Sequence, residues 1–106
     1  MSISERYRQI WEQIDTESDR LYEILPEEMA KALRQVDRAV EEMQEFAETV
    51  GEIPQFQLEA KLSPVLLKGH ECLDRARVML EAAGHEKEAA GIWELEQLIY
   101  RLLNDL

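Results

Sequence analysis

The stretch from Met29 to Gln55, "MAKALRQVDRAVEEMQEFAETVGEIPQ", decides the fold, because it joins a very regular helical pattern to a clear interruption. Its apolar residues recur at alternating steps of four and three, and this spacing places them on one face of an amphipathic helix. They are Met29, Leu33, Val36, Val40, Met43, Ala47 and Val50, broadened on one side by Ala32, Ala39 and Phe46. The pattern predicts a helix that buries this face against other helices.

The segment "GEIPQ", Gly51 to Gln55, is predicted to end that helix. Gly51 is expected to take the left-handed conformation that closes many helices, and Pro54 prevents the helix from resuming. Downstream, Ser63 is a suitable N-cap and Pro64 a suitable first residue, so we expect the next helix to begin there. The intervening Phe56–Leu62 segment is compatible with a short helix or with a crossing at the end of a bundle.

Pro26 separates this helix from an earlier one, which is predicted to begin with a capping box of Ser2 and Glu5. Proline disfavours a helical residue before it and suits the first turn of a new helix. The apolar pattern nevertheless continues through Pro26, so a kinked helix from Ser4 to Val50, about 70 Å long, is an alternative. We prefer a tight hairpin, because a compact monomer cannot cover a helix of that length.

The remaining pattern completes an all-α fold. The helix after Pro64 is predicted to end at Gly84, and a last helix is expected from about His85 to Leu106. Four helices of similar length with short connections indicate an antiparallel up-down-up-down four-helix bundle, which forms one domain over residues 1–106. The alternative fold is a hairpin of long kinked helices that dimerises.

The charge of the chain restricts its partners. The 106 residues include 23 acids and 12 bases, for a net charge of −11. Phosphate backbones and anionic lipids repel such a protein, so we expect neither direct nucleic-acid binding nor membrane binding, and expect instead a protein partner with a basic surface. Cys72 is the one cysteine, so an internal disulfide is impossible and a cytoplasmic location is expected. No stretch has the pattern of a signal peptide or of a membrane span.

These features favour a non-catalytic protein–protein interaction module of the inhibitor, immunity-protein, adaptor or chaperone type. Trp93 and Tyr100 lie seven residues apart and form an aromatic flank that one bundle need not cover completely. The alternative is that they cap the core beside Trp11 or Tyr7. Exposed aromatics suit a partner protein or a second copy of the chain, so a homo-oligomer stays possible. The acids Glu41, Glu45 and Glu48 are further interaction candidates, because they would steer a basic partner.

A Mg²⁺-dependent enzyme is the first alternative. Glu41, Glu42 and Glu45, followed after 25 residues by Glu71 and Asp74, resemble the signature of all-α nucleoside triphosphate pyrophosphohydrolases. In that family, carboxylates on two neighbouring helices bind Mg²⁺, and the resemblance implies the same role for these five residues. The heptad phase, however, directs both acid groups towards solvent, and a metal site requires that they converge. Our main interpretation is therefore a solvated acidic face with no metal and no cofactor.

A histidine phosphotransfer domain is the second alternative, since these domains resemble this chain as acidic four-helix bundles of similar size with an exposed histidine. The candidate here is His70, but the family places Lys and Gly after its histidine, whereas Lys68 and Gly69 precede His70. A soft-metal site is not expected, because His70 and Cys72 face different directions on a helix and His85 follows the Gly84 break.

Overall fold

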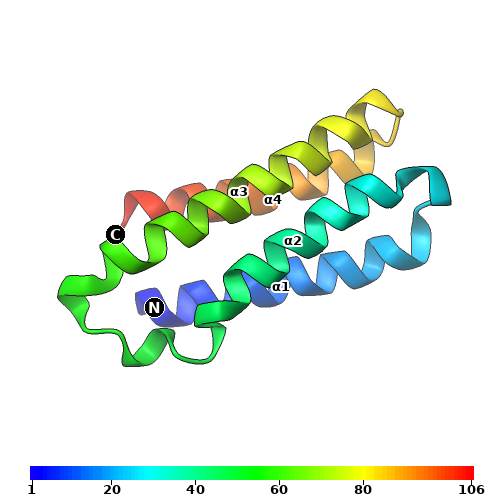
Figure 1. Ribbon diagram of the computed structural model, residues 1–106. Coiled ribbons are helices and arrows are strands. Elements are labelled where there is room, and N and C mark those ends of the chain that lie inside the picture. Colours follow the sequence, from blue (N-terminus) through cyan, green and yellow to red (C-terminus); the bar gives the residue numbers. More distant parts are fainter.

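Four helices and three short 3₁₀ turns make up the computed structural model, which describes residues 1–106. The helices are α1 (Ile3–Ile24), α2 (Ala30–Ala47), α3 (Leu58–Ala82) and α4 (Glu86–Asn104). They run antiparallel in sequence order, α1 packs on α2, α2 on α3, α3 on α4 and α4 on α1, and both chain ends lie at the same end of the bundle (Figure 1). The predicted up-down-up-down bundle is confirmed. None of the four helices has the length and apolar character needed to cross a membrane.

The chain reverses direction at Pro26, so the hairpin is confirmed and the long kinked helix is wrong. Leu25 and Pro26 are extended, with ψ values of 142° and 163°, and a 3₁₀ turn, η1 (Glu27–Met29), leads into α2. The first helix begins as predicted, because the Ser2 side chain accepts a hydrogen bond of 3.1 Å from the Glu5 backbone N–H. At the end of the bundle where both chain ends lie, an ion pair of 2.7 Å between Arg6 and Asp105 joins α1 to the end of α4.

The end of α2 differs from the prediction. The α-helix stops at Ala47, and the chain continues through two 3₁₀ turns, η2 (Val50–Glu52) and η3 (Gln55–Gln57). Gly51 belongs to the first of these turns and has no positive φ, so its predicted left-handed role is wrong. Gly84 does have a positive φ, 85°, and it follows the end of α3 as predicted.

The start of α3 is also earlier than predicted, because the helix begins at Leu58 and contains Pro64 in its interior. Leu58 and Leu62 continue the apolar stripe of this helix and are 7% and 0% exposed. Burying a leucine side chain stabilises by about 1.5–3 kcal/mol, whereas an interior proline costs about 3 kcal/mol. Two buried leucines therefore offset the proline, whose ring lies on the exposed side of the helix.

The core is continuous along the bundle, but the buried face of α2 is rotated from the predicted one. Ala32 and Ala39 are fully buried, while the larger Leu33 and Val40 are partly exposed. Small side chains at the centre of this face let the neighbouring helices approach. The largest fully buried side chains come from all four helices: Tyr7, Ile14, Leu21, Val36, Met43, Leu62, Leu66, Leu73, Leu80, Ile92, Ile99 and Leu102.

Two aromatic side chains bond α1 to the backbone of α2. The Tyr7 hydroxyl donates to the Met43 carbonyl at 2.6 Å, and the Trp11 indole N–H donates to the Val40 carbonyl at 3.0 Å. Burial raises the pKa of Tyr7, so its phenol stays a neutral donor. Both bonds fix α1 laterally against α2, and they leave α4 without a comparable bond from the middle of α1.

The space beside Gly69 and Gly91 shows how closely the helices pack at these two positions. A Cβ added at Gly69 would lie 3.1 Å from Met43 Sδ, whereas a Cβ at Gly91 would meet no atom within 4 Å. We predict that Gly69→Val lowers the free energy of unfolding by about 1–3 kcal/mol through overpacking. Gly91→Ala should raise it by up to about 1 kcal/mol, because alanine is the better helix former. Urea unfolding of the two variants measures both effects, and equal changes in the two would contradict this packing.

Candidate functional site

Trp93 and Tyr100 lie on the outer side of α4 and are about half exposed, at 51% and 54%. Their separation of seven residues places them two turns apart on the same side of the helix. The bundle therefore covers neither aromatic completely, and their role in binding a partner stays a prediction. Large aromatic side chains of this exposure are a feature of protein-binding surfaces, where they contribute much of the contact area.

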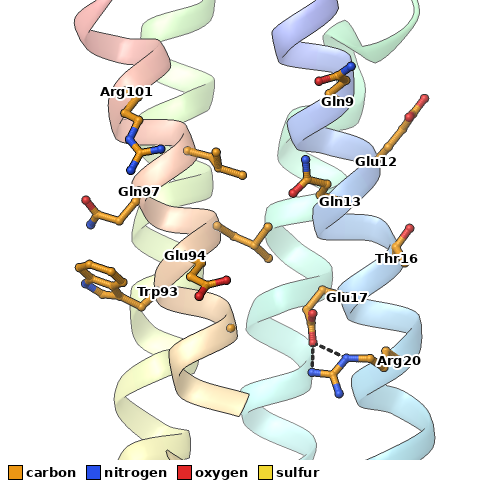
Figure 2. A pocket seen from close by; sticks show the side chains of 13 residues that line it. Gln9, Glu12, Gln13, Thr16, Glu17, Arg20, Trp93, Glu94, Gln97 and Arg101 are labelled. Atoms are coloured by element: carbon orange, nitrogen blue, oxygen red, sulfur yellow. Dashed lines mark hydrogen bonds and ion pairs between the residues drawn. The ribbon is translucent and has the colours of Figure 1, made fainter. Parts of the chain in front are cut away.

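A groove between α1 and α4 begins beside Trp93 and has a volume of about 830 Å³ (Figure 2). Gly91 contributes no side chain to this space, and the bonds of Tyr7 and Trp11 hold α1 against α2 instead of α4. The 13 residues that line it are mostly polar: Gln9, Glu12, Gln13, Thr16, Glu17, Arg20, Gly91, Trp93, Glu94, Leu95, Gln97, Leu98 and Arg101.

The charges in this groove are only partly neutralised within the protein. Glu17 and Arg20 form an ion pair on α1, as the dashed lines in Figure 2 show. Glu12, Glu94 and Arg101 are exposed and take part in no ion pair. Together with the glutamine amides, these groups leave unused hydrogen-bonding capacity along both walls of the groove.

A second, smaller hollow lies on the other side of Trp93, between α3 and α4. It has a volume of about 550 Å³ and is lined by Arg77, Glu81, Glu86, Ala90 and Trp93. Trp93 therefore borders two depressions, one facing α1 and one facing α3. This position makes it the central residue of the exposed α4 surface.

Glu96 lies beneath this surface and is 2% exposed, although it is an acid in the middle of α4. Two cationic or potentially cationic groups of α3 face it: Arg77 Nε is 3.4 Å from Oε2, and His70 Nε2 is 3.7 Å from Oε1. Oε2 is buried and has no hydrogen-bond partner. Arg77 instead donates to Asp74 Oδ1 at 2.8 and 3.1 Å and to Glu81 at 2.8 Å.

This environment raises the pKa of Glu96 to about 8. The largest cause is burial, which disfavours the charged form, and the nearby Asp74 carboxylate adds to it, while Arg77 acts in the opposite direction. The hydrogen bond from Arg77 holds the pKa of Asp74 below its ordinary value, so Asp74 is the ionised member of the pair. At neutral pH Glu96 is therefore mainly a neutral carboxyl group, able to donate a hydrogen bond.

We predict a specific pH dependence of stability from Glu96. Between its ordinary pKa of 4.5 and its folded pKa of about 8, folded Glu96 keeps a proton that the unfolded chain releases. The stabilisation from this proton is thus complete below pH 4.5 and is lost as the pH rises through 8. Between these two values the free energy of unfolding falls by up to about 1.4 kcal/mol per pH unit. In Glu96→Gln, which keeps a neutral donor, this slope should disappear. If the unfolding free energies of wild type and Glu96→Gln change in parallel with pH, this prediction is contradicted.

The five acids of the metal alternative are not brought together. Nowhere does the structure group three or more His, Cys, Asp or Glu side chains so that they could hold a metal ion. Glu41, Glu42 and Glu45 lie on α2, while Glu71 pairs with Arg75 and Asp74 with Arg77 on α3 itself. Neighbouring arginines are thus the partners of the α3 acids, which the spacing of the acids alone could not reveal.

The other predicted residues are distributed over different surfaces. Glu41, Glu45 and Glu48 are exposed on α2 and at its end, diagonally across the bundle from α4, so they do not share a surface with Trp93 and Tyr100. His70 is half-buried beside Glu96, and Cys72 is fully buried, where burial raises the pKa of its thiol.

Sequence reasoning missed Glu96 and Arg77, although the position of Glu96 within an apolar stripe could have indicated that it is buried. Glu96 follows Ile92 by four residues and precedes Ile99 by three, and both isoleucines are fully buried. An acid at such a position of an apolar stripe is expected to be buried. Ser18 is a milder case of the same kind, since it interrupts the α1 stripe, is buried, and donates a hydrogen bond to Asp37 of α2.

Comparison with known proteins identified no relative. No protein-family model, no curated protein and no solved structure matches the chain.

Proposed function

We propose that the protein is a non-catalytic interaction module that binds a basic helical segment of a partner protein along α4. The observation that carries the proposal is half-exposed Trp93 at the edge of a polar groove between α4 and α1, with half-exposed Tyr100 two turns along the same side of α4. Aromatic anchors next to a groove are the arrangement by which helical peptides are bound, with the apolar side of the peptide on the aromatics.

Charge complementarity argues for a basic occupant. The protein carries a net charge of −11, and the groove holds two unpaired acids, Glu12 and Glu94, against one unpaired base, Arg101. A lysine or arginine of the partner can supply the missing charge, and long-range attraction would speed association. The same net charge disfavours a second copy of this chain as the occupant, because two such surfaces repel one another.

The length of the groove matches a short helix. On α1 its lining runs from Gln9 to Arg20, which corresponds to about 16 Å at 1.5 Å per residue. On α4 it runs from Gly91 to Arg101, a similar distance. The groove therefore matches about three turns of a partner helix in length, with Trp93 near one end.

The hydrolase alternative has no comparable support. Glu71 and Asp74 each pair with an arginine of their own helix, and Glu41 and Glu45 are exposed on α2. Trp93, Tyr100 and Glu94 of α4 take part in no hydrogen bond or ion pair within the protein, whereas a Mg²⁺ site would require the ion pairs of Glu71 and Asp74 to be broken.

The test is comparative affinity capture from the native host with wild type and a Trp93→Ala/Tyr100→Ala variant. We expect wild type to retain a stoichiometric basic protein that salt releases. Loss of an aromatic anchor costs about 2 kcal/mol or more, so the variant should bind it at least about 30-fold more weakly. Amide NMR shifts on adding a purified basic segment of that protein should map to α1 and α4.

Leu67→Ala is the matched control, because Leu67 is 58% exposed on α3 and lines neither the groove nor the hollow. It should bind as wild type does. Equal weakening by both substitutions, an acidic captured protein, or NMR shifts confined to α2 and α3 would reject the proposal.

A further inference from the structure

Arg77 contacts carboxyl groups both in the interior and at the surface. Its guanidinium donates to Asp74 and to Glu81, both at 2.8 Å, while its Nε also lies 3.4 Å from the unpartnered Oε2 of Glu96. One cation therefore faces three carboxyl groups. Two of these, Asp74 and Glu81, are about half exposed, whereas the Glu96 side chain is 3% exposed.

The protonation of Glu96 changes the charge balance of this cluster. With Glu96 neutral, Arg77, Asp74 and Glu81 sum to −1, and loss of the Glu96 proton makes the sum −2, with the added charge in the interior. A buried unpaired charge is strongly unfavourable, whereas water solvates the exposed carboxylate of Glu81. The more favourable arrangement after deprotonation therefore pairs the guanidinium with Glu96 at the expense of Glu81.

The same guanidinium lines the hollow beside Trp93, together with Glu81, Glu86 and Ala90. We propose that Glu96 and Arg77 form a protonation-controlled switch beneath the α4 surface, in which loss of the Glu96 proton turns Arg77 from Glu81 towards the interior and leaves the hollow beside Trp93 more negative. The switch strengthens the attraction of this surface for a basic partner as the pH rises, and in this respect it rests on the proposed function.

The groups that act on Glu96 come from one side. From α3, His70, Asp74 and Arg77 face it, and Glu81 acts through Arg77. On the α1 side of α4, the charged groups Glu12, Glu17, Arg20, Glu94 and Arg101 line the groove. The raised pKa of Glu96, about 8, places the transition in a range in which Asp74, with its lowered pKa, stays ionised.

The experiment uses the free, full chain, so it is independent of any partner. The ¹³C resonance of the Glu96 carboxyl group and the fluorescence of Trp93, isolated from that of Trp11 by subtracting a Trp93→Phe variant, are followed from pH 5 to 10. We expect one shared transition with a midpoint near pH 8. Glu96→Gln should abolish the fluorescence transition, and Glu59→Gln, an exposed acid outside the cluster, should leave it unchanged.

Arg77→Lys separates the switch from simple titration, because lysine keeps the charge but lacks the planar fork that spans two carboxylates. The Glu96 transition should persist in this variant, while that of Trp93 shrinks. The inference is overturned if Glu96 titrates near 4.5, if it titrates near 8 without any change at Trp93, or if Trp93 responds equally in Glu96→Gln. If the Glu96→Gln protein does not fold, the two wild-type titrations decide. Failure of partner capture would reject the proposed function and leave this result intact.

Discussion

The burial of the α3 stripe between α2 and α4 is the interaction on which the rest of the structure depends. Leu58, Leu62, Leu66, Leu73 and Leu80 of this one helix are all buried, and their burial draws the helix through Pro64. Gly69, midway along the stripe, lets Met43 of α2 and Ile99 of α4 approach the same point of α3. The three helices α2, α3 and α4 thus form a closely packed unit, to which α1 is added.

The attachment of α1 explains where an open surface is left. Tyr7 and Trp11 donate to carbonyl groups of α2, and such bonds are directional, so they fix α1 on that side. On the other side the groove between α1 and α4 is lined by many side chains that prefer water, glutamines and glutamates among them. The groove is therefore a consequence of unequal packing around the bundle, and Trp93 is exposed because no neighbouring helix covers the outer side of α4.

Glu96 and Arg77 link this exposed surface to the interior. A buried acid in a helix bundle reduces stability unless it is neutral or paired, and here neutrality is maintained up to about pH 8. An apolar residue at this position would pack without such a cost, so stability alone does not account for Glu96. Arg77, the cation that faces Glu96, also borders the hollow beside Trp93. Through Arg77, the protonation of the buried acid can affect the charge of the proposed binding surface.

The sequence by itself determined the four helices and their interruptions at Pro26 and Gly84, because these features follow from periodicity and from local backbone preferences. It left open whether Pro26 marks a hairpin or a kink and whether Trp93 and Tyr100 are exposed, and the structure decided both. The sequence also indicated that the clustered acids are a solvated face. Only the tertiary structure decided where α3 begins, since the burial of Leu58 and Leu62 outweighs the local signal of Ser63 and Pro64. The groove and the Glu96 cluster were likewise beyond the sequence, because they depend on which residues of different helices lie at the same level of the bundle. Spacing within one helix carries no information on that register.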